Sequence, residues 1–252
     1  MPLIVRDAAS HVVLITIDNQ AKRNAMSREM LAELAALWDR LACDPACRAI
    51  VITGAGEKGF CAGADIGGDL TASPEMAATI NRSLLKTSVF PKPIIAAVNG
   101  DCAGGGVELL LATDIRAAAP HARFGLPEVR FAIYPFGGAT VKLVEQIGYV
   151  HAMDLILTGR LVDAQTAARL GLINEVVAAD ALLDWAIAKA GTIAANSPAA
   201  VQAVKTQIST TIAEHTQALE AREQSLGDRV RASPDFKEGV AAFLEKRKPE
   251  YR

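Results

Sequence analysis

The order of strand-like and helix-like runs along the chain most constrains its fold. Runs rich in β-branched or small apolar residues, typical of buried strands, are "HVVLITID", "RAIVIT" and "IIAAVNG", at residues 11–18, 48–53 and 94–100. Between the first two, "SREMLAELAALWDRLA" places its apolar residues on one helical face, with Ser27 as the N-cap. Strands that alternate with helices predict an α/β fold with a mainly parallel sheet.

The rest of the chain extends this pattern and then abandons it. Further helices are expected at residues 74–89, 137–148 and 151–159, and short strands at 114–119, 122–129 and 172–177. From about Ser197 onward no strand-like run follows. Residues 198–232 predict one long helix with proline in its first turn, and residues 233–248 predict a second. We therefore expect an α/β core at 1–196 and a helical region at 197–252, which is either a packing appendage or an oligomerisation element.

Composition excludes several classes of partner. The net charge of −2 and the aromatic content of 5% give no sign of nucleic-acid binding. Apolar stretches are interrupted well before the roughly 18 residues of a membrane span, and the N-terminal sequence lacks the features of a signal peptide. The four cysteines form no C-x-x-C pair, and no cluster of histidine and cysteine suggests a metal site. A reduced, cytoplasmic protein that binds no metal is the expectation.

One familiar motif fails on its context. Gly54, Gly56 and Gly59 form a G-x-G-x-x-G directly after a predicted strand, which is the pattern of a dinucleotide-binding turn. The sequence that follows, "FCAGADIGGDL", contains too many glycines to form the helix that would receive a pyrophosphate. We therefore do not expect NAD binding.

Two other glycine-rich turns form the candidate site. "GFCAGADI" and "AGGGVE" each follow a buried strand, where α/β proteins place ligands and where small residues let a ligand approach backbone N–H groups. Two such groups aimed at one oxygen would form an oxyanion hole. Glu108 lies one helical turn after Gly105, and Glu128 follows a proline at the end of a predicted strand. Each glutamate is a candidate acid or base, and a helix-cap or salt-bridge role is the alternative for each.

The combination of four segments resembles the enoyl-CoA hydratase/isomerase superfamily, the crotonase family. They are "GFCAGADI", "KPIIAAVNGDCAGGGVELLLATDI", "ARFGLPEV" and "LTGRLVDAQTAARLGLINEVV", in that order, and the similarity runs nearly end to end. The resemblance implies a spiral of β-β-α units with a helical C-terminal region used for trimerisation, as a homotrimer or a hexamer built as a dimer of trimers. It implies an acyl-CoA substrate and no cofactor apart from the coenzyme A of that substrate.

The resemblance also implies roles for single residues. The backbone N–H groups of Ala62 and Gly105 would hold the thioester oxygen, and Glu108 and Glu128 would position and activate the added water. Isomerases of the family commonly keep only the second glutamate, so the presence of both favours a hydratase. Residues placed along the CoA or the acyl group are Ala25, Ala64, Asp65, Ile66 and Phe136, with Phe243 and Lys246 near the CoA of the same or a neighbouring subunit.

Two residues depart from the pattern of the family. Phe136 stands where hydratases often have a glycine, and Arg130 falls in a stretch that is usually apolar. The expected reaction is hydration of a trans-2-enoyl-CoA. The alternatives are an isomerase or a CoA-thioester hydrolase of the same superfamily, and a catalytically silent scaffold that binds acyl-CoA.

Overall fold

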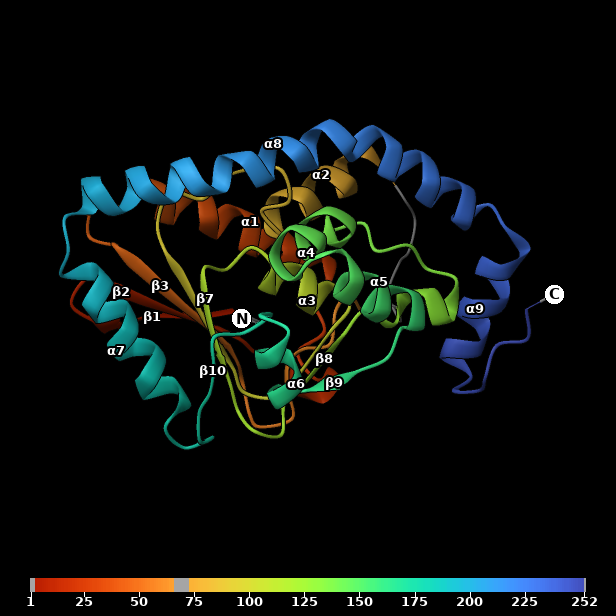
Figure 1. Cartoon of the computed structure of the whole chain (residues 1–252), viewed down its shortest axis with the longest axis horizontal. Coiled ribbons are helices and arrows are strands. Elements are labelled where there is room, and N and C mark those ends of the chain that lie inside the picture. Colours follow the sequence, from red (N-terminus) through yellow and green to blue (C-terminus); the bar gives the residue numbers. More distant parts are fainter. Residues whose placement is uncertain (1–2, 66–72, 252) are drawn as a thin grey trace.

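The larger of two sheets carries the core of the protein. A computed structural model describes residues 3–65 and 73–251, and Figure 1 shows its elements in order. In this part of the chain the sheet has the strand order β1-β2-β3-β5-β7-β10. Its strands are β1 (Leu3–Ala9), β2 (Val12–Ile17), β3 (Ala49–Gly54), β5 (Ile94–Val98), β7 (Ile115–Ala118) and β10 (Glu175–Val176). All neighbours are parallel except β1 and β2, which form an antiparallel hairpin that the sequence analysis did not predict.

A second, smaller sheet lies beside the first and has the strand order β4-β6-β8-β9. Its strands are β4 (Gly59–Cys61), β6 (Asp101–Ala103), β8 (Arg123–Gly125) and β9 (Val162–Asp163). Strands β3, β5 and β7 of the large sheet are each followed in the chain by a short strand of this small sheet. This repetition confirms the expected α/β fold built from β-β-α units.

The two faces of the large sheet are buried against different helices. In β2, Val12 and Leu14 pack in one apolar cluster, and Val13 and Ile15 pack in another. This alternation follows from the two-residue period of a strand. The first cluster includes residues of α7 (Leu182–Ala194), and the second includes residues of α1 (Arg28–Cys43). Because both faces are covered, the strands read as nearly continuous apolar runs.

One helix is shorter than its sequence pattern predicts. Helix α2 (Pro74–Ser83) ends well before residue 89, and Leu85 just beyond it has φ +46°. A residue in the left-handed region cannot continue a right-handed helix. The indole N–H of Trp38 on α1 donates to the carbonyl of Ser83 at 2.9 Å, which fixes this end of α2 against α1. The remaining helices of the core are α3 (Gly105–Leu110), α4 (Ala139–Ile147), α5 (Tyr149–Thr158) and α6 (Ala164–Arg169).

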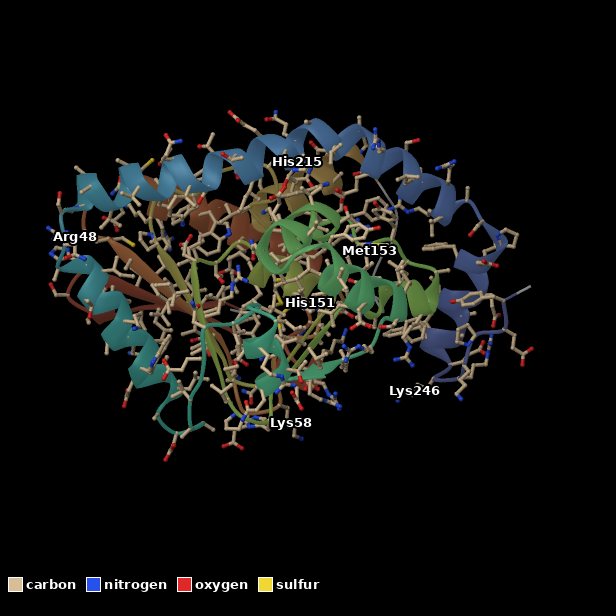
Figure 2. The ribbon with its side chains drawn as sticks, in the orientation of Figure 1. Arg48, Lys58, His151, Met153, His215 and Lys246 are labelled. Carbon is tan, nitrogen blue, oxygen red and sulfur yellow. The ribbon has the colours of Figure 1, made fainter. Side chains whose placement is uncertain are left out.

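The C-terminal helices are packed against the core. In Figure 1, α8 (Pro198–Arg231) runs along one long side of the molecule, and α9 (Pro234–Leu244) lies at one end near the C-terminus. His215 of α8, labelled in Figure 2, lies 2.8 Å from the carboxylate of Glu145 on α4. Phe243 of α9 meets Phe131 edge-on, with ring centroids 5.1 Å apart. Helix α9 therefore packs against the segment that carries Glu128.

The four cysteines are all unpaired. None of the helices in the described residues combines the length and apolarity that a membrane crossing requires.

Candidate active site

The two glycine-rich turns meet at the ends of adjacent strands. Strands β4 and β6 are parallel neighbours, with Cys61 opposite Cys102 in the ladder. An ideal Cβ on Gly106, at the start of α3, would lie 2.1 Å from the carbonyl oxygen of Cys61, so only glycine permits this approach. Gly104 begins the second turn with φ +56°, in the region that favours glycine. The glycines therefore allow the two backbones to pack closely, and they also leave room for a ligand to approach.

One predicted oxyanion donor is already engaged elsewhere. The backbone N–H of Ala62 donates to the carbonyl oxygen of Arg23 at 3.1 Å, so it is not available to a substrate. The assignment of Ala62 as a donor is therefore wrong, because the hydrogen bond to Arg23 uses its only backbone proton. Two residues further on, the N–H of Ala64 has no hydrogen-bond acceptor among the described residues, and neither has that of Gly105. An ideal Cβ on Gly105 would lie 3.5 Å from the Ala64 nitrogen, so the two groups are neighbours.

Glu108 is buried and held by one backbone donor. Its side chain projects from α3, the residue is 6% exposed, and its Oε1 accepts a hydrogen bond from the N–H of Gly137 at 2.6 Å. Burial raises the pKa of the Glu108 carboxyl, and the nearby carboxylate of Glu128 raises it further. A carboxyl group in this setting exchanges a proton much nearer to neutral pH than an exposed glutamate does.

Glu128 has fewer partners. It lies on the 3-10 helix η2 (Pro127–Phe131), and its Oε2 is buried without a hydrogen-bond partner among the described residues. An ideal Cβ on Gly104 would lie 3.0 Å from its Oε1, so the carboxylate faces the second glycine-rich turn. Burial raises the pKa of Glu128 as well. A buried carboxylate with an unpaired oxygen is costly unless a substrate or water completes it, and this favours a chemical role over a capping role.

A cavity of about 280 Å³ joins these groups. Of the residues singled out from the sequence, those that line it are Ala62, Ala64, Gly105, Glu108, Glu128, Phe136 and Phe243. Ala25 is buried and does not line it, and Lys246 is exposed near the end of α9, as Figure 2 shows. Asp65 forms an ion pair with Lys22 at 2.5 Å. Ile66 lies outside the described residues.

The cavity also includes residues that the sequence analysis missed. Arg231, Gly227 and Val230 of α8 line it, together with Ile80 and Leu84 from the region of α2. A glycine inside a helix is unfavourable, so Gly227 is the sequence signal that another group packs closely there. No sequence feature separates Arg231 from the other arginines of α8.

Behind Glu108 lies a buried ion pair. Lys86 and Glu223 are each 3% exposed, and Lys86 Nζ lies 3.3 Å from Glu223 Oε1. An ideal Cβ on Gly138 would lie 3.2 Å from Lys86 Cγ, so the pair supports the turn whose neighbouring residue, Gly137, binds Glu108. The charges of Lys86 and Glu223 both act on the pKa of Glu108, in opposite directions.

Metal-ligating side chains are not clustered. Within the residues 3–65 and 73–251, no group of three or more His, Cys, Asp or Glu side chains is placed to hold a metal ion. Figure 2 shows two of the histidines, His151 and His215, on different helices. Beside the two glycine-rich turns, the cavity brings together two carboxyl groups and backbone N–H donors, which suit proton transfer beside a polarised carbonyl.

The chain is similar to known proteins over nearly its full length. The family model described as Enoyl-CoA hydratase/isomerase matches residues 7–252. The chain is 40% identical over 249 residues to the enoyl-CoA hydratase EchA19 of Mycobacterium tuberculosis, covering 96% of this chain and 93% of that protein. It is 35% identical to the 2,3-dehydroadipyl-CoA hydratase of Escherichia coli, covering 100% and 99%. The crystal structure of a carnitinyl-CoA hydratase from Mycobacterium avium superposes with a TM-score of 0.91 at 37% identity, covering 100% and 98%.

Proposed function

The chain belongs to the enoyl-CoA hydratase/isomerase family and is a hydratase of CoA thioesters, and we propose that it hydrates a trans-2-enoyl-CoA to the 3-hydroxyacyl-CoA. The observation that carries this proposal is the presence of the buried Glu108 and the half-buried Glu128 in one cavity with the N–H groups of Ala64 and Gly105. An isomerase of the family commonly keeps only the second glutamate, so the pair favours hydration.

The proposed reaction divides the work between the two carboxyl groups. The thioester oxygen binds at the N–H groups of Ala64 and Gly105, which stabilise the enolate-like charge that develops there. The deprotonated glutamate takes a proton from the water molecule, and the hydroxide that remains bonds to C3. The protonated glutamate delivers a proton to C2, so the pair ends with as many protons as it began.

The environment of the pair supports this division. Burial raises the pKa of both carboxyl groups, and the charge on Glu128 raises that of Glu108. Two neighbouring carboxyl groups in an apolar site do not ionise together readily, which favours a state near neutral pH in which the pair shares one proton. This state provides one acid and one base.

The proposals on cofactors, oligomeric state and location rest on the resemblance to the family. We propose that coenzyme A enters as part of the substrate and that no cofactor or metal is needed. We propose a homotrimer, or a hexamer of two trimers, in the cytoplasm. Exposed apolar side chains on α5 are available for such contacts, since Tyr149, Val150 and Leu157 are 65%, 74% and 64% exposed.

The direct test is a hydration assay with crotonyl-CoA and longer trans-2-enoyl-CoAs. Loss of the enoyl absorbance, with identification of the 3-hydroxyacyl-CoA product, is the expected result. An isomerase would instead generate that absorbance from a 3-enoyl-CoA, and a hydrolase would release free CoA thiol. A protein that binds these thioesters and converts none of them would contradict the proposal.

A further inference from the structure

A single cation lines the active-site cavity in the described residues. The side chains around it are apolar or small except for the two glutamates, the Tyr134 hydroxyl and the guanidinium of Arg231. Arg231 is the last residue of α8, and its side chain is 33% exposed. A charged group is costly in the wall of a pocket that receives only an alkyl chain, because the chain would strip water from it without replacing its hydrogen bonds.

The guanidinium is held against an aromatic ring. Its central carbon lies 4.8 Å from the ring centroid of Phe136, within the range of a cation–π contact. The Phe136 ring rests on Gly227, where an ideal Cβ would lie 2.1 Å from Phe136 Cζ. Tyr134 packs against the same ring, with centroids 5.4 Å apart. Arg231 therefore has a defined place in the cavity.

Arg231 and the catalytic carboxyl group of Glu108 are held by consecutive residues of one segment, Phe136 and Gly137. The N–H groups of Ala64 and Gly105 are neighbours, and Glu108 lies one turn after Gly105 on α3. Glu108 in turn accepts a hydrogen bond from the N–H of Gly137. Phe136, which precedes Gly137, then carries the guanidinium. Because Ala64, Gly105, Phe136 and Arg231 line one cavity, the acyl chain of a thioester whose oxygen sits at the two donors has Phe136 and Arg231 in the wall of the space that it enters.

Arg231 keeps donors available for a ligand. Its Nη1 pairs with Asp228 Oδ1 at 2.9 Å, one turn earlier on the same helix, but the Asp228 side chain is 54% exposed. The same oxygen also accepts from Gln224 Nε2 at 2.9 Å. An exposed ion pair such as that of Arg231 and Asp228 is weak, so a ligand can compete for the guanidinium. A guanidinium has five N–H donors in a planar fork that matches a carboxylate.

We propose that this enzyme acts on 2-enoyl-CoA thioesters whose acyl chain ends in a carboxylate, and that Arg231 binds that carboxylate. The inference rests on the proposed hydration reaction. It assigns Arg231 to recognition of the far end of the acyl group, with Phe136 holding the guanidinium in place.

The test compares two substrates that differ only at that end. One is trans-2-hexenoyl-CoA, and the other is 5-carboxy-2-pentenoyl-CoA, in which a carboxylate replaces the terminal methyl group. The wild-type enzyme should have the higher kcat/KM for the carboxylated substrate. Arg231→Gln should lower that value about 10- to 100-fold, the scale of one charge-assisted hydrogen-bonded contact, and change the value for hexenoyl-CoA less than about threefold.

Matched variants separate charge from geometry. Arg231→Lys keeps the charge and loses the planar fork, so it should retain part of the preference. Arg229→Gln removes an exposed arginine of the same helix that does not line the cavity, and it should leave both substrates unchanged. A wild-type preference for hexenoyl-CoA would overturn the inference. Equal losses on both substrates in Arg231→Gln would also overturn it, because Arg231 would then act on the CoA part.

Binding of saturated analogues tests the role of Arg231 independently of catalysis. Hexanoyl-CoA and adipoyl-CoA cannot be hydrated, and calorimetry should find tighter binding of adipoyl-CoA to the wild type but not to Arg231→Gln. If neither enoyl substrate is hydrated, the proposed function fails, and this pair of analogues alone decides the role of Arg231. Equal affinities of the wild type for both analogues would contradict it.

Discussion

The backbone N–H of Gly137 donates to Glu108 Oε1 at 2.6 Å, and an ideal Cβ on Gly137 would lie 2.4 Å from the carboxyl carbon of Glu108. Position 137 must therefore be glycine, because any other side chain would collide with the Glu108 carboxyl group that it holds. This contact ties the segment before α4 to the helix that begins at the second glycine-rich turn.

Gly137→Ala should therefore reduce turnover while the protein stays folded. The added methyl group must displace the Glu108 carboxyl, and a misplacement of about 1 Å costs on the order of 10²-fold in rate. The measurement is kcat on a trans-2-enoyl-CoA, with the melting temperature as the check on folding. Gly191→Ala is the matched control, because nothing lies within 4 Å of its ideal Cβ on α7, and full activity of Gly137→Ala would contradict the account.

Gly227 and Phe136 should be coupled in stability. Gly→Ala inside a helix normally stabilises by about 1 kcal/mol, but here the new Cβ meets the Phe136 ring and should instead cost roughly 1–3 kcal/mol. In a Phe136→Ala background the clash is gone, so Gly227→Ala should be neutral or stabilising. Denaturant unfolding of the four proteins measures the coupling. Additive effects of the two substitutions would mean that the ring does not rest on Gly227.

Lys86→Met should be among the most destabilising single changes. It leaves the Glu223 carboxylate buried without its cation, which typically costs about 3–5 kcal/mol. Lys86→Met combined with Glu223→Leu replaces the pair by apolar side chains and should recover most of the loss. Chemical denaturation of the single and double variants tests this. A double variant that is no more stable than Lys86→Met would contradict the pairing.

The raised pKa values of the glutamates predict a specific pH dependence of stability. Between the ordinary value of 4.5 and its raised pKa in the folded state, Glu108 binds a proton more tightly when the protein is folded. The wild type therefore loses stability relative to Glu108→Gln as pH rises from 4.5 toward neutral. The difference in melting temperature between variant and wild type should be constant below pH 4.5 and should grow above it. A difference that is the same at all pH values would contradict a raised pKa.

The sequence predicted the fold where the signal was local. The strand at residues 48–53 and the helix beginning after Ser27 were readable from periodicity and capping, and the structure has both. Strands β4 and β6 were not, because each has three residues and owes its existence to its neighbour in the small sheet. The end of α2 was misjudged because the left-handed conformation of Leu85 leaves no mark on composition.

The site was predictable in its parts but not in its details. The spacing of Gly105 and Glu108 on one helix placed both at the cavity. Whether Ala62 or Ala64 is the oxyanion donor depends on which of their N–H groups hydrogen-bonds to the carbonyl of Arg23. This is a tertiary contact, which the sequence does not reveal. Arg231 reaches the cavity from more than a hundred residues away in sequence, so only the packing of α8 over the core could place it there.

The central claim is that Glu108 and Glu128 act together on one water, and the most direct test is hydration by the two glutamine variants and their double variant. Glutamine keeps the shape of the side chain and removes its proton chemistry. Each single change should lower kcat by about 10²- to 10⁴-fold. The double variant should lose less than the product of the two losses, because the groups serve the same step. The affinity for a saturated acyl-CoA should survive in all three variants. Normal hydration by Glu108→Gln, with activity lost only in Glu128→Gln, would indicate single-glutamate chemistry and contradict the account.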